Sequence, residues 1–382
     1  MMYTRVPTIS ILRLAALLWT CSTVAASCTT GSGNAPAAAD SPTITEAQGL
    51  TIERAGGYTT VSVANPWKQG QTLHTYILVP RDSEIPSTLP EGTLVRTPIE
   101  RAVVYSAVHG GVIKELGEMS SIAGVCDAEY FNMAEIQEGI ADGSVADAGS
   151  SMSPSVERII ALQPDAIILS PFQNAGYGAL TSLGVPIIEC ADYMESTPLG
   201  RAEWVKLFGE LYCKPNAADS IFQATSAAYN AIKTSVASAA GRPKVLTEML
   251  YSGVWYVPGG GSYMAAMLRD AGAEYPWSDD QSTGSLSLDL PQVLNRASDA
   301  DVWLIKPMAA LDYAALRREN KLYGEFKAFK EKRVYQCVTL GSTLYQDFPF
   351  HPDVLLSDYV AIFHPEIAPG GSTRYYHPLP GD

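Results

Sequence analysis

The sequence predicts an α/β protein with two Rossmann-like lobes, each built around a central parallel sheet, and a β-rich N-terminal segment. Short apolar runs alternate with helical patterns along most of the chain, as in a parallel sheet that is covered on both faces. One helical pattern, at 216–240, covers about 25 residues and would span roughly 37 Å. That length suits a single backbone helix that joins the two lobes.

The N-terminus predicts an export signal that is separate from the fold. Two arginines lie around an apolar stretch that continues to Ala26 and is too short to span a membrane, so we interpret residues 1–27 as a signal peptide. The small residues before Cys28 resemble a bacterial lipobox, which makes Cys28 the predicted lipidation site. Cys21 is a second candidate, and ordinary cleavage near Ala26 is the alternative to lipidation.

The next two segments differ in composition. Residues 28–43 are rich in glycine, alanine, serine and proline, which predicts a flexible tether. Residues 44–100 predict β-strands, because runs such as 59–63 and 72–79 are rich in β-branched and apolar residues and are separated by glycine and proline.

The first lobe is expected to contain four buried strands, at Ala102–Tyr105, Ile122–Cys126, Ala166–Ser170 and Ile187–Cys190. Ser153 and Pro154 predict a helix start with serine as the cap and proline in the first turn. The buried stripe of that helix would be Val156, Ile159 and Ile160. A second helix is expected to begin at 197–198.

The second lobe repeats this pattern after the long helix, for which Asn216 is the predicted cap. Residues 290–300 lead from a helix into a strand as residues 156–166 do in the first lobe. The predicted strands are Lys244–Met249, Val302–Ile305 and Val334–Thr339, and the predicted helices are Ser262–Ala271 and Pro352–Phe363. We therefore divide the folded chain into an N-terminal lobe at 44–214, a backbone helix at 215–242 and a C-terminal lobe at 243–382.

Composition and cysteine spacing exclude several classes of function. The net charge is −14, with no basic stripe of the kind that nucleic-acid binding requires. The remaining cysteines, Cys126, Cys190, Cys213 and Cys337, match no metal motif. Cys126 and Cys190 each end a predicted strand, but two intervening strands would separate them, so we expect no disulfide between them.

The strongest signals are three segments of the first lobe: 103–109, 153–165 and 199–204. Together with 284–288 and 364–366 they resemble the class III periplasmic binding proteins, the helical-backbone receptors that serve cobalamin, ferric-siderophore and haem ABC importers. The resemblance covers about residues 95–368. It implies a ligand cleft between two lobes that the helix at 216–240 bridges.

The predicted fold places candidate ligand residues in such a cleft, because ligands of open α/β sheets bind beyond the carboxyl ends of the strands. The chain has 20 tyrosines and 6 tryptophans, which stack on flat ligands while they keep a polar group. The candidates are Tyr105, His109, Tyr130 and Phe172 in the first lobe, and Tyr251, Trp255, Tyr345, Asp347 and Phe348 in the second.

The resemblance also implies one exposed glutamate on each lobe that docks on arginines of the permease. The matching position in the first lobe is Glu157, which would otherwise serve only as a favourable first-turn residue of its helix. In the second lobe Pro291 occupies the acidic position, and Asp289 either supplies the charge or caps the helix.

These observations predict an envelope protein, anchored to the membrane only through its lipid, that captures an iron–siderophore complex, haem or cobalamin for an ABC permease and its ATPase. We expect a monomer in the periplasm or cell envelope of a bacterium, without a cofactor or a resident metal. One alternative is a zinc or manganese receptor with ligands such as His109, His351 and Asp347, although five histidines are few for such a site. Another is a surface receptor for haem or iron complexes that works without a permease.

An enzyme is not expected, because the chain has no nucleophile elbow, P-loop or paired-histidine motif. Gly259, Gly260 and Gly261 precede a predicted helix but lack the lysine of a phosphate-binding loop.

Overall fold

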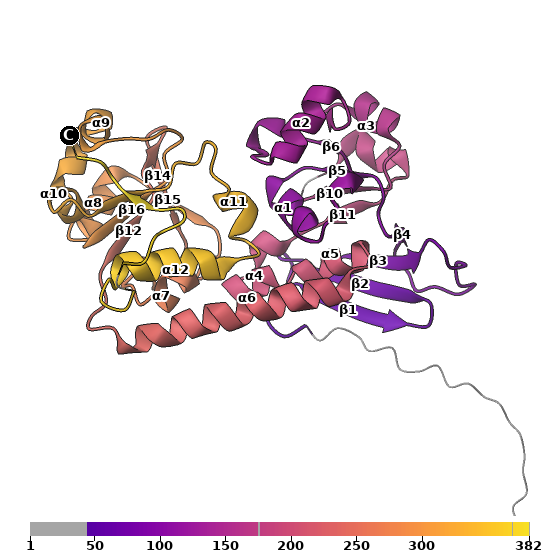
Figure 1. Ribbon diagram of the computed structural model, residues 1–382, viewed down its shortest axis with the longest axis horizontal. Helices are drawn as coiled ribbons and strands as arrows, with labels where there is room; N and C mark the ends of the chain where they lie inside the picture. Colours follow the sequence, from indigo (N-terminus) through magenta and orange to yellow (C-terminus); the bar gives the residue numbers. More distant parts are fainter. Residues whose placement is uncertain (1–43, 175, 369, 382) are drawn as a thin grey trace, which may run out of the picture. The chain divides into compact units, whose positions relative to one another are not determined.

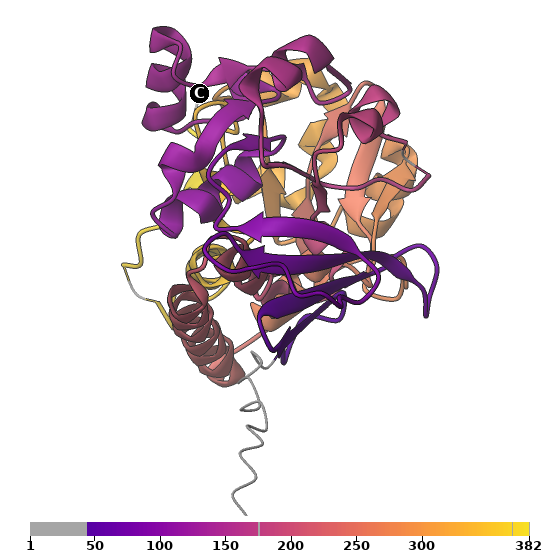
Figure 2. The same ribbon diagram turned by 90° about the vertical axis from the view of Figure 1, so that its right-hand side faces the viewer.

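The β-rich N-terminal segment forms a sheet of its own. The computed structural model describes residues 44–174, 176–368 and 370–381, so the predicted signal peptide, Cys28, Cys21 and the tether lie outside the described residues. Figure 2 shows the four strands in indigo, paired in chain order. Buried and exposed residues alternate along β1, as expected for a sheet with one covered face. The strands are β1 (Leu50–Ala55), β2 (Tyr58–Ala64), β3 (Thr72–Pro80) and β4 (Thr93–Thr97).

The first lobe contains a parallel sheet with the strand order β11-β10-β5-β6-β7. Successive residues of β5 serve opposite faces: Ala102 and Val104 belong to the core that includes Trp204, whereas Val103 packs with Ile159 in a smaller core. The predicted covering of both faces is therefore confirmed. The strands are β5 (Ala102–Val104), β6 (Ile122–Val125), β7 (Ala146–Asp147), β10 (Ala166–Leu169) and β11 (Ile187–Glu189), and a small ribbon joins β8 (Gly149–Ser150) to β9 (Ser153–Pro154).

The first lobe has five short helices among the described residues, of which α4 lies beside α6 (Figure 1). They are α1 (Ala107–Glu115), α2 (Ala134–Asp142), α3 (Val156–Leu162), α4 (Pro198–Ala202) and α5 (Val205–Leu211). The predicted start of α4 is confirmed, because Thr197 caps the helix and its side chain accepts a hydrogen bond from the Gly200 amide at 3.0 Å. Short 3-10 turns follow the strands at η2 (Ala128–Tyr130), η3 (Gly178–Leu183) and η4 (Asp192–Met194).

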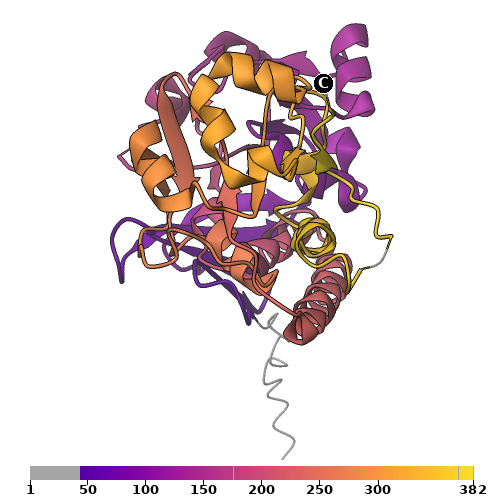
Figure 3. The same ribbon diagram turned by 90° about the vertical axis from the view of Figure 1, so that its left-hand side faces the viewer.

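The long helix α6 (Pro215–Ser235) joins the two lobes. It packs against α5 of the first lobe and against α12 (Pro352–Phe363) of the second, and Figure 3 shows α6 and α12 side by side and nearly end-on. Its buried residues are Ala218, Phe222, Thr225 and Tyr229, at helical spacings of three and four.

The second lobe contains a sheet with the order β12-β16-β17-β18, in which only β18 is antiparallel, beside an antiparallel sheet β13-β14-β15. The strands are β12 (Val245–Thr247), β13 (Leu250–Tyr251), β14 (Val254–Pro258), β15 (Ser285–Leu288), β16 (Val302–Ile305), β17 (Val334–Gln336) and β18 (His377–Pro378). Its other helices are α7 (Tyr263–Asp270), α8 (Leu290–Ala297), α9 (Tyr313–Glu319), α10 (Lys327–Lys330) and α11 (Leu344–Asp347).

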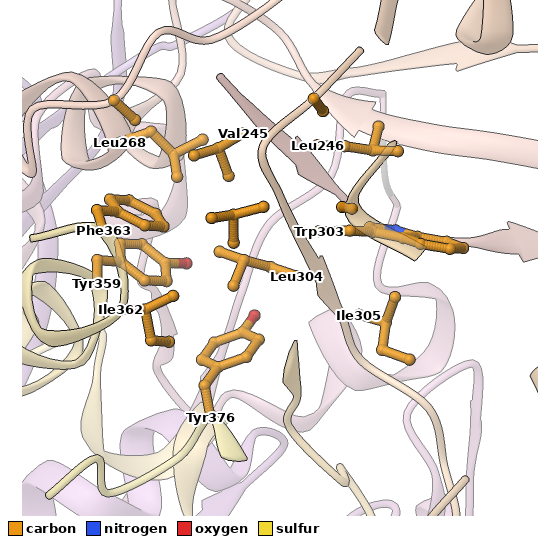
Figure 4. Packing of buried hydrophobic residues seen from close by; sticks show 14 of the residues in the cluster. Val245, Leu246, Leu268, Trp303, Leu304, Ile305, Tyr359, Ile362, Phe363 and Tyr376 are labelled. Carbon is orange, nitrogen blue, oxygen red and sulfur yellow. The ribbon is translucent and has the colours of Figure 1, made fainter. Parts of the chain in front are cut away.

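One part of the core of the second lobe lies between its parallel sheet and α12. Figure 4 shows Val245, Leu304, Tyr359 and Phe363 packed together, with Trp303 on the other side of the strand. Burial of an aliphatic or aromatic side chain of this kind contributes about 1.5–3 kcal/mol relative to exposure. This core therefore holds α12, and through it α6, against the second lobe.

Some predicted helix boundaries were wrong. Ser153 and Pro154 form β9, and α3 begins two residues later, with Ser155 in the cap position. Ile160 was predicted to be buried, but its side chain is 53% exposed, because the short helix covers the sheet mainly through Ile159. Asn216 does not cap α6, since Lys214 precedes the helix and Pro215 begins it.

Two further features of the described residues are the state of the cysteines and the length of the apolar helices. Cys126, Cys190, Cys213 and Cys337 are free thiols, and β5 and β10 separate the strands that Cys126 and Cys190 follow. Within the described ranges, no helix is both long and apolar enough to cross a membrane.

The buried carboxylate of Glu203 anchors the start of the described chain to the first lobe. Its oxygens accept hydrogen bonds from the amides of Thr45, Glu46 and Ala47, at 2.7–3.1 Å. The carboxylate also forms an ion pair with Lys206 at 3.0 Å. Burial opposes the charge, but these donors hold the pKa of Glu203 below its ordinary value. The charged form therefore stabilises the fold above the unfolded-state pKa, and this contribution is lost as the pH falls through the lower folded-state pKa.

We predict that Glu203→Gln lowers the free energy of unfolding by about 1–3 kcal/mol at pH 7, because an amide cannot accept the same set of donors. The deficit should shrink as the pH falls below the ordinary glutamate pKa of about 4.3, and it should disappear as the pH falls through the lower folded-state pKa, where the wild-type carboxylate also becomes protonated. Urea denaturation at several pH values measures both effects. The control is Glu91→Gln, at an exposed glutamate before β4; equal stability of the two variants at pH 7 would contradict the prediction.

Candidate ligand-binding cleft

A cavity of about 420 Å³ lies where the strand ends of the two lobes meet. Tyr105 directly follows β5 and Asp127 follows β6, whereas Met308 and Leu340 follow β16 and β17 of the second lobe. The first-lobe residue Asn132 donates a hydrogen bond to the Ser342 carbonyl of the second lobe at 2.9 Å. The cavity is therefore placed where parallel α/β sheets bind ligands, beyond the carboxyl ends of the strands.

A second cavity of about 540 Å³ continues from the first one. Tyr105 and Ser106 line both, so the two cavities are adjacent, and we refer to them together as the branched cleft. The walls of the second cavity come from the β8–β9 ribbon and from the loops after β10, and they include Met152, Phe172 and Tyr177.

The cleft carries exposed aromatic and aliphatic side chains from both lobes. Tyr130 is 63% exposed, Phe172 is 62% exposed and Tyr345 is 45% exposed. Met308 and Leu340 are also more than half exposed. Large apolar side chains that stay open to water around a cavity indicate a surface for an apolar or flat ligand.

Four of the nine predicted ligand residues line the cleft: Tyr105, Tyr130, Phe172 and Tyr345. Burial, followed by the effect of the neighbouring Cys126 thiol, raises the pKa of Tyr105 above its ordinary value. Burial likewise raises the pKa of Cys126 to about 12. The Tyr105 phenol that lines the cleft is therefore neutral at neutral pH, and so is the buried Cys126 thiol beside it.

His109 was predicted to reach the ligand, but the structure buries it. Its Nε2 lies 3.2 Å from Oδ1 of Asp192, and the exposed fraction of both side chains is 1%. The other carboxylate oxygen of Asp192 accepts a hydrogen bond from Nε of Arg201 at 2.9 Å. Burial alone would raise the pKa of Asp192, yet Arg201 and His109 hold it below its ordinary value. His109 thus supports a buried charge between α1 and α4.

Phe348 was also predicted to contact ligand, and it is buried at the junction of the lobes instead. The Arg201 guanidinium lies 5.6 Å from the Phe348 ring centroid and 4.9 Å from that of Tyr263, and it donates a hydrogen bond to the Tyr263 hydroxyl at 2.6 Å. Tyr263 belongs to α7 and Phe348 follows α11. Phe348 therefore connects the second lobe to the buried ion pair.

The prediction for Trp255 is corrected as well. Trp255 lies on β14, its side chain is fully buried, and its indole donates a hydrogen bond to the Thr247 carbonyl at 2.9 Å. It stacks on Trp303 with ring centroids 5.7 Å apart. A tryptophan after a strand reached the core here because β13 and β14 fold back over the parallel sheet.

The structure does not bring Tyr251 or Asp347 into the cleft. Tyr251 is 70% exposed on β13 but lines neither cavity. Asp347 accepts hydrogen bonds from Thr343 at 2.6 Å and from Arg374 at 2.9 Å, so its carboxylate holds the C-terminal segment against α11.

Three residues that line the cleft were not predicted: Met152, Met308 and Leu340. Met308 and Leu340 follow predicted strands, so their position was a usable signal, although they are not aromatic. Met152 lies in the turn of the β8–β9 ribbon, which short-range patterns do not predict.

A close helix contact holds the second-lobe wall of the cleft in place. A Cβ atom at Gly111 of α1 would lie 2.4 Å from the Gln346 carbonyl oxygen of α11, so only glycine permits this approach. Beside it, Nε2 of His351 lies 2.7 Å from the Glu115 carboxylate. The hydrogen bond to Glu115 raises the pKa of His351 above its ordinary value, although burial opposes this. The contact carries Tyr345, also on α11, against the first lobe.

The two predicted docking residues lie in different surroundings. Glu157 is exposed in the first turn of α3. Asp289 is exposed too, but its carboxylate accepts a hydrogen bond from the Gln292 amide at 2.8 Å and completes a capping box for α8. Pro291 lies in the first turn of α8. Among the described residues, no group of three or more His, Cys, Asp or Glu side chains is arranged to hold a metal ion.

Comparison with known proteins identifies relatives over most of the chain. A family model described as periplasmic binding protein matches residues 102–338. An uncharacterized lipoprotein of Methanocaldococcus jannaschii is 27% identical over 321 residues, which are 80% of this chain and 76% of the relative. A second uncharacterized lipoprotein of that organism is 24% identical over 335 residues, or 82% of this chain and 83% of the relative.

Several solved structures share the fold at low sequence identity. A periplasmic heme binding protein from Pseudomonas aeruginosa matches with a TM-score of 0.55 and 19% identity, over 70% of this chain and 93% of that one. A Fe3+-hydroxamate transport system protein from Saccharomonospora viridis has a TM-score of 0.55 and 17% identity, with the same coverage of 70% and 93%. A periplasmic binding protein from Veillonella parvula has a TM-score of 0.56 and 15% identity, over 81% of this chain and 99% of that one.

We predict that Asp192→Asn and Arg201→Met each lower the free energy of unfolding by about 3–5 kcal/mol, because each leaves a buried charge without its partner. The double variant should lose less than the sum of the two, since it removes both charges. Urea denaturation of the four proteins gives the coupling energy. The exposed pair Lys114 and Glu135 is the control, for which we expect less than about 1 kcal/mol of coupling; the buried pair would be unimportant if its two losses simply added.

Proposed function

Because the chain belongs to the periplasmic binding protein family, we propose that it captures an iron complex, either a siderophore complex or haem, or a cobalamin, and delivers it to an ABC permease. One observation carries this proposal: the branched cleft between the lobes is walled by exposed aromatic side chains at the carboxyl ends of both sheets. Aromatic faces bind flat or bulky chelates through stacking and apolar burial.

The proposed ligand class also draws support from the structural neighbours. Their printed names include a heme binding protein and a Fe3+-hydroxamate transport system protein. The neighbours share the two-lobed architecture with this chain, and most of the residues that line the cleft here are uncharged, with aromatic and aliphatic side chains among them that suit such chelates. In this role the protein binds its ligand reversibly and changes no covalent bond.

We place the protein in the cell envelope, where a lipid on Cys28 would tether it to the membrane surface. Two relatives named as lipoproteins support this location. A tether at 28–43 would let the folded part reach a permease in the same membrane.

Docking on the permease is assigned to Glu157 on the first lobe and to Asp289 on the second. The exposure of Glu157 in the first turn of α3 supports the first assignment. The second is weaker, because the Asp289 carboxylate already caps α8 and Pro291 occupies the acidic position of the family. Pro291 favours one alternative, a surface receptor that holds its ligand without two-armed docking.

A zinc or manganese receptor draws less support from the structure. His109 is committed to Asp192, and His351 pairs with Glu115 on the outer side of the α1–α11 contact. Asp347 is held by Arg374 and Thr343. The side chains that would have to meet around the ion therefore have other partners.

We predict that Tyr130→Ala weakens ligand binding by about tenfold, or about 1.4 kcal/mol, because it removes one aromatic wall of the cleft. Ferric tris-hydroxamate, haemin and cyanocobalamin are each titrated into the purified protein while tyrosine and tryptophan fluorescence is followed. Tyr256→Ala is the matched control, since Tyr256 is 44% exposed but lines neither cavity. If none of the chelates bound at micromolar concentration, the proposed function would be wrong.

We further predict that Glu157→Arg abolishes most ligand uptake by cells while the purified variant keeps its affinity. Reversal of the charge would repel the permease arginines without any change at the cleft. Uptake of the radiolabelled ligand is compared with that of Glu138→Arg, at an exposed glutamate of α2. Undiminished uptake by Glu157→Arg would remove this residue from the docking surface.

A further inference from the structure

The charged side chains of the cleft all have the same sign. Asp127 and Glu129, both in the loop after β6, line the cavity between the lobes. No lysine, arginine or histidine lines either branch of the cleft within the described part of the chain, and the second branch has no charged lining residue there. The ligand therefore meets two carboxylates and otherwise neutral walls.

The two carboxylates are available to a ligand. Asp127 accepts one hydrogen bond, from the Ser151 amide at 3.1 Å, and Glu129 is exposed at the start of the short turn η2. Neither forms an ion pair with a described residue. No cationic side chain of the described residues therefore compensates either carboxylate.

Two cations of the described residues, Lys306 and Arg201, are already paired with carboxylates. Lys306, whose ammonium lies 6.0 Å from the Tyr345 ring centroid, pairs with Glu248 at 2.6 Å. Arg201 pairs with the buried Asp192 at 2.9 Å. Neither cation lines the cleft, and each already has an anionic partner within the protein.

The negative charge of the cleft distinguishes between metal chelates that its aromatic side chains alone would bind with similar affinity. Haem carries propionates and ferric tris-catecholates are anions, so each would enter a partly desolvated cavity against like charges, which costs affinity. The ferric tris-hydroxamate core is neutral, because three hydroxamates balance Fe3+, and the corrinoid cyanocobalamin is neutral as well. A pendant ammonium on such a chelate would gain from the same carboxylates.

We propose that the cleft selects uncharged or cationic metal chelates, of the hydroxamate or corrinoid kind, and rejects haem and ferric catecholates. The proposal rests on the proposed function, because it assumes that metal chelates are the ligands. It assigns Glu129 and Asp127 as the residues that set the charge preference.

Two ligands that share one chelate core but differ in the charge of a pendant group separate the effect of ligand charge on affinity from that of ligand shape. A linear ferric tris-hydroxamate with a pendant ammonium is compared with its N-succinyl derivative, which carries a carboxylate on the same chelate. We expect the ammonium form to bind about tenfold more tightly at low ionic strength, and the difference to narrow with added salt. Cyanocobalamin, haemin and a ferric tris-catecholate are titrated in parallel to separate the hydroxamate and corrinoid classes.

Charge reversal at the rim then tests the assigned residue. Glu129→Lys should lower the ratio of the affinities for the ammonium and succinyl chelates by about threefold to tenfold, and Glu129→Gln should lower it less. Both variants should fold normally, because the Glu129 side chain is exposed and its replacement leaves the core intact. Glu138→Lys makes the same change of net charge at an exposed site on α2 outside the cleft, and should leave the preference unchanged.

The outcomes separate the two proposals. Tight binding of haemin or the catecholate complex, with weak binding of the uncharged and cationic chelates, would overturn the charge selection and leave the proposed function standing. An equal effect of Glu129→Lys and Glu138→Lys would show that net charge, and not the cleft, sets the preference. Failure of every chelate to bind would overturn the proposed function itself.

Discussion

The arrangement of the two lobes depends on one buried charge, the carboxylate of Asp192. Taken alone, an ionised aspartate with 1% of its side chain exposed would be strongly destabilising. The chain supports it from one side with His109 of α1 and from the other with Arg201 of α4. Arg201 also contacts Tyr263 and Phe348 of the second lobe, so the same guanidinium pairs with the buried charge and links the two lobes.

The cleft is a consequence of that junction. Its floor is closed where Gly111 of α1 meets the backbone of α11, and α6 packs against helices of both lobes. What remains open are the carboxyl ends of the strands, where the aromatic side chains stay exposed because the opposite wall belongs to another lobe. A rigid junction and open strand ends are the properties that a receptor needs if it is to bind a bulky ligand with little internal rearrangement.

The carboxylates of this acidic chain have different roles, and the role of each one depends on its burial and on its hydrogen-bond partners. Glu203 is buried among backbone amides and fastens the N-terminal sheet, whereas Asp192 fastens the lobes. Asp289 caps a helix. Glu157 and Glu129 stay exposed, on the outer surface and at the cleft, where charge can act on a partner or a ligand. Net charge alone would have suggested only a soluble acidic surface.

The sequence by itself determined the fold class and most of the elements, because these follow from short-range patterns. Predicted strands such as 302–305 and the last helix at 352–363 match the structure at both ends, since apolar runs and proline-led helix starts act locally. Only the tertiary structure decided which strand-end residues reach the cleft. Like Tyr105 and Tyr130, the residues His109, Trp255 and Phe348 were expected in the cleft because they follow predicted strands. Instead, His109 pairs with a buried carboxylate, Trp255 is buried where the β13–β14 hairpin folds back, and Phe348 is buried at the lobe junction. A strand end fixes the edge of the sheet at which a residue lies, but the direction of its side chain depends on packing partners that are distant in the sequence.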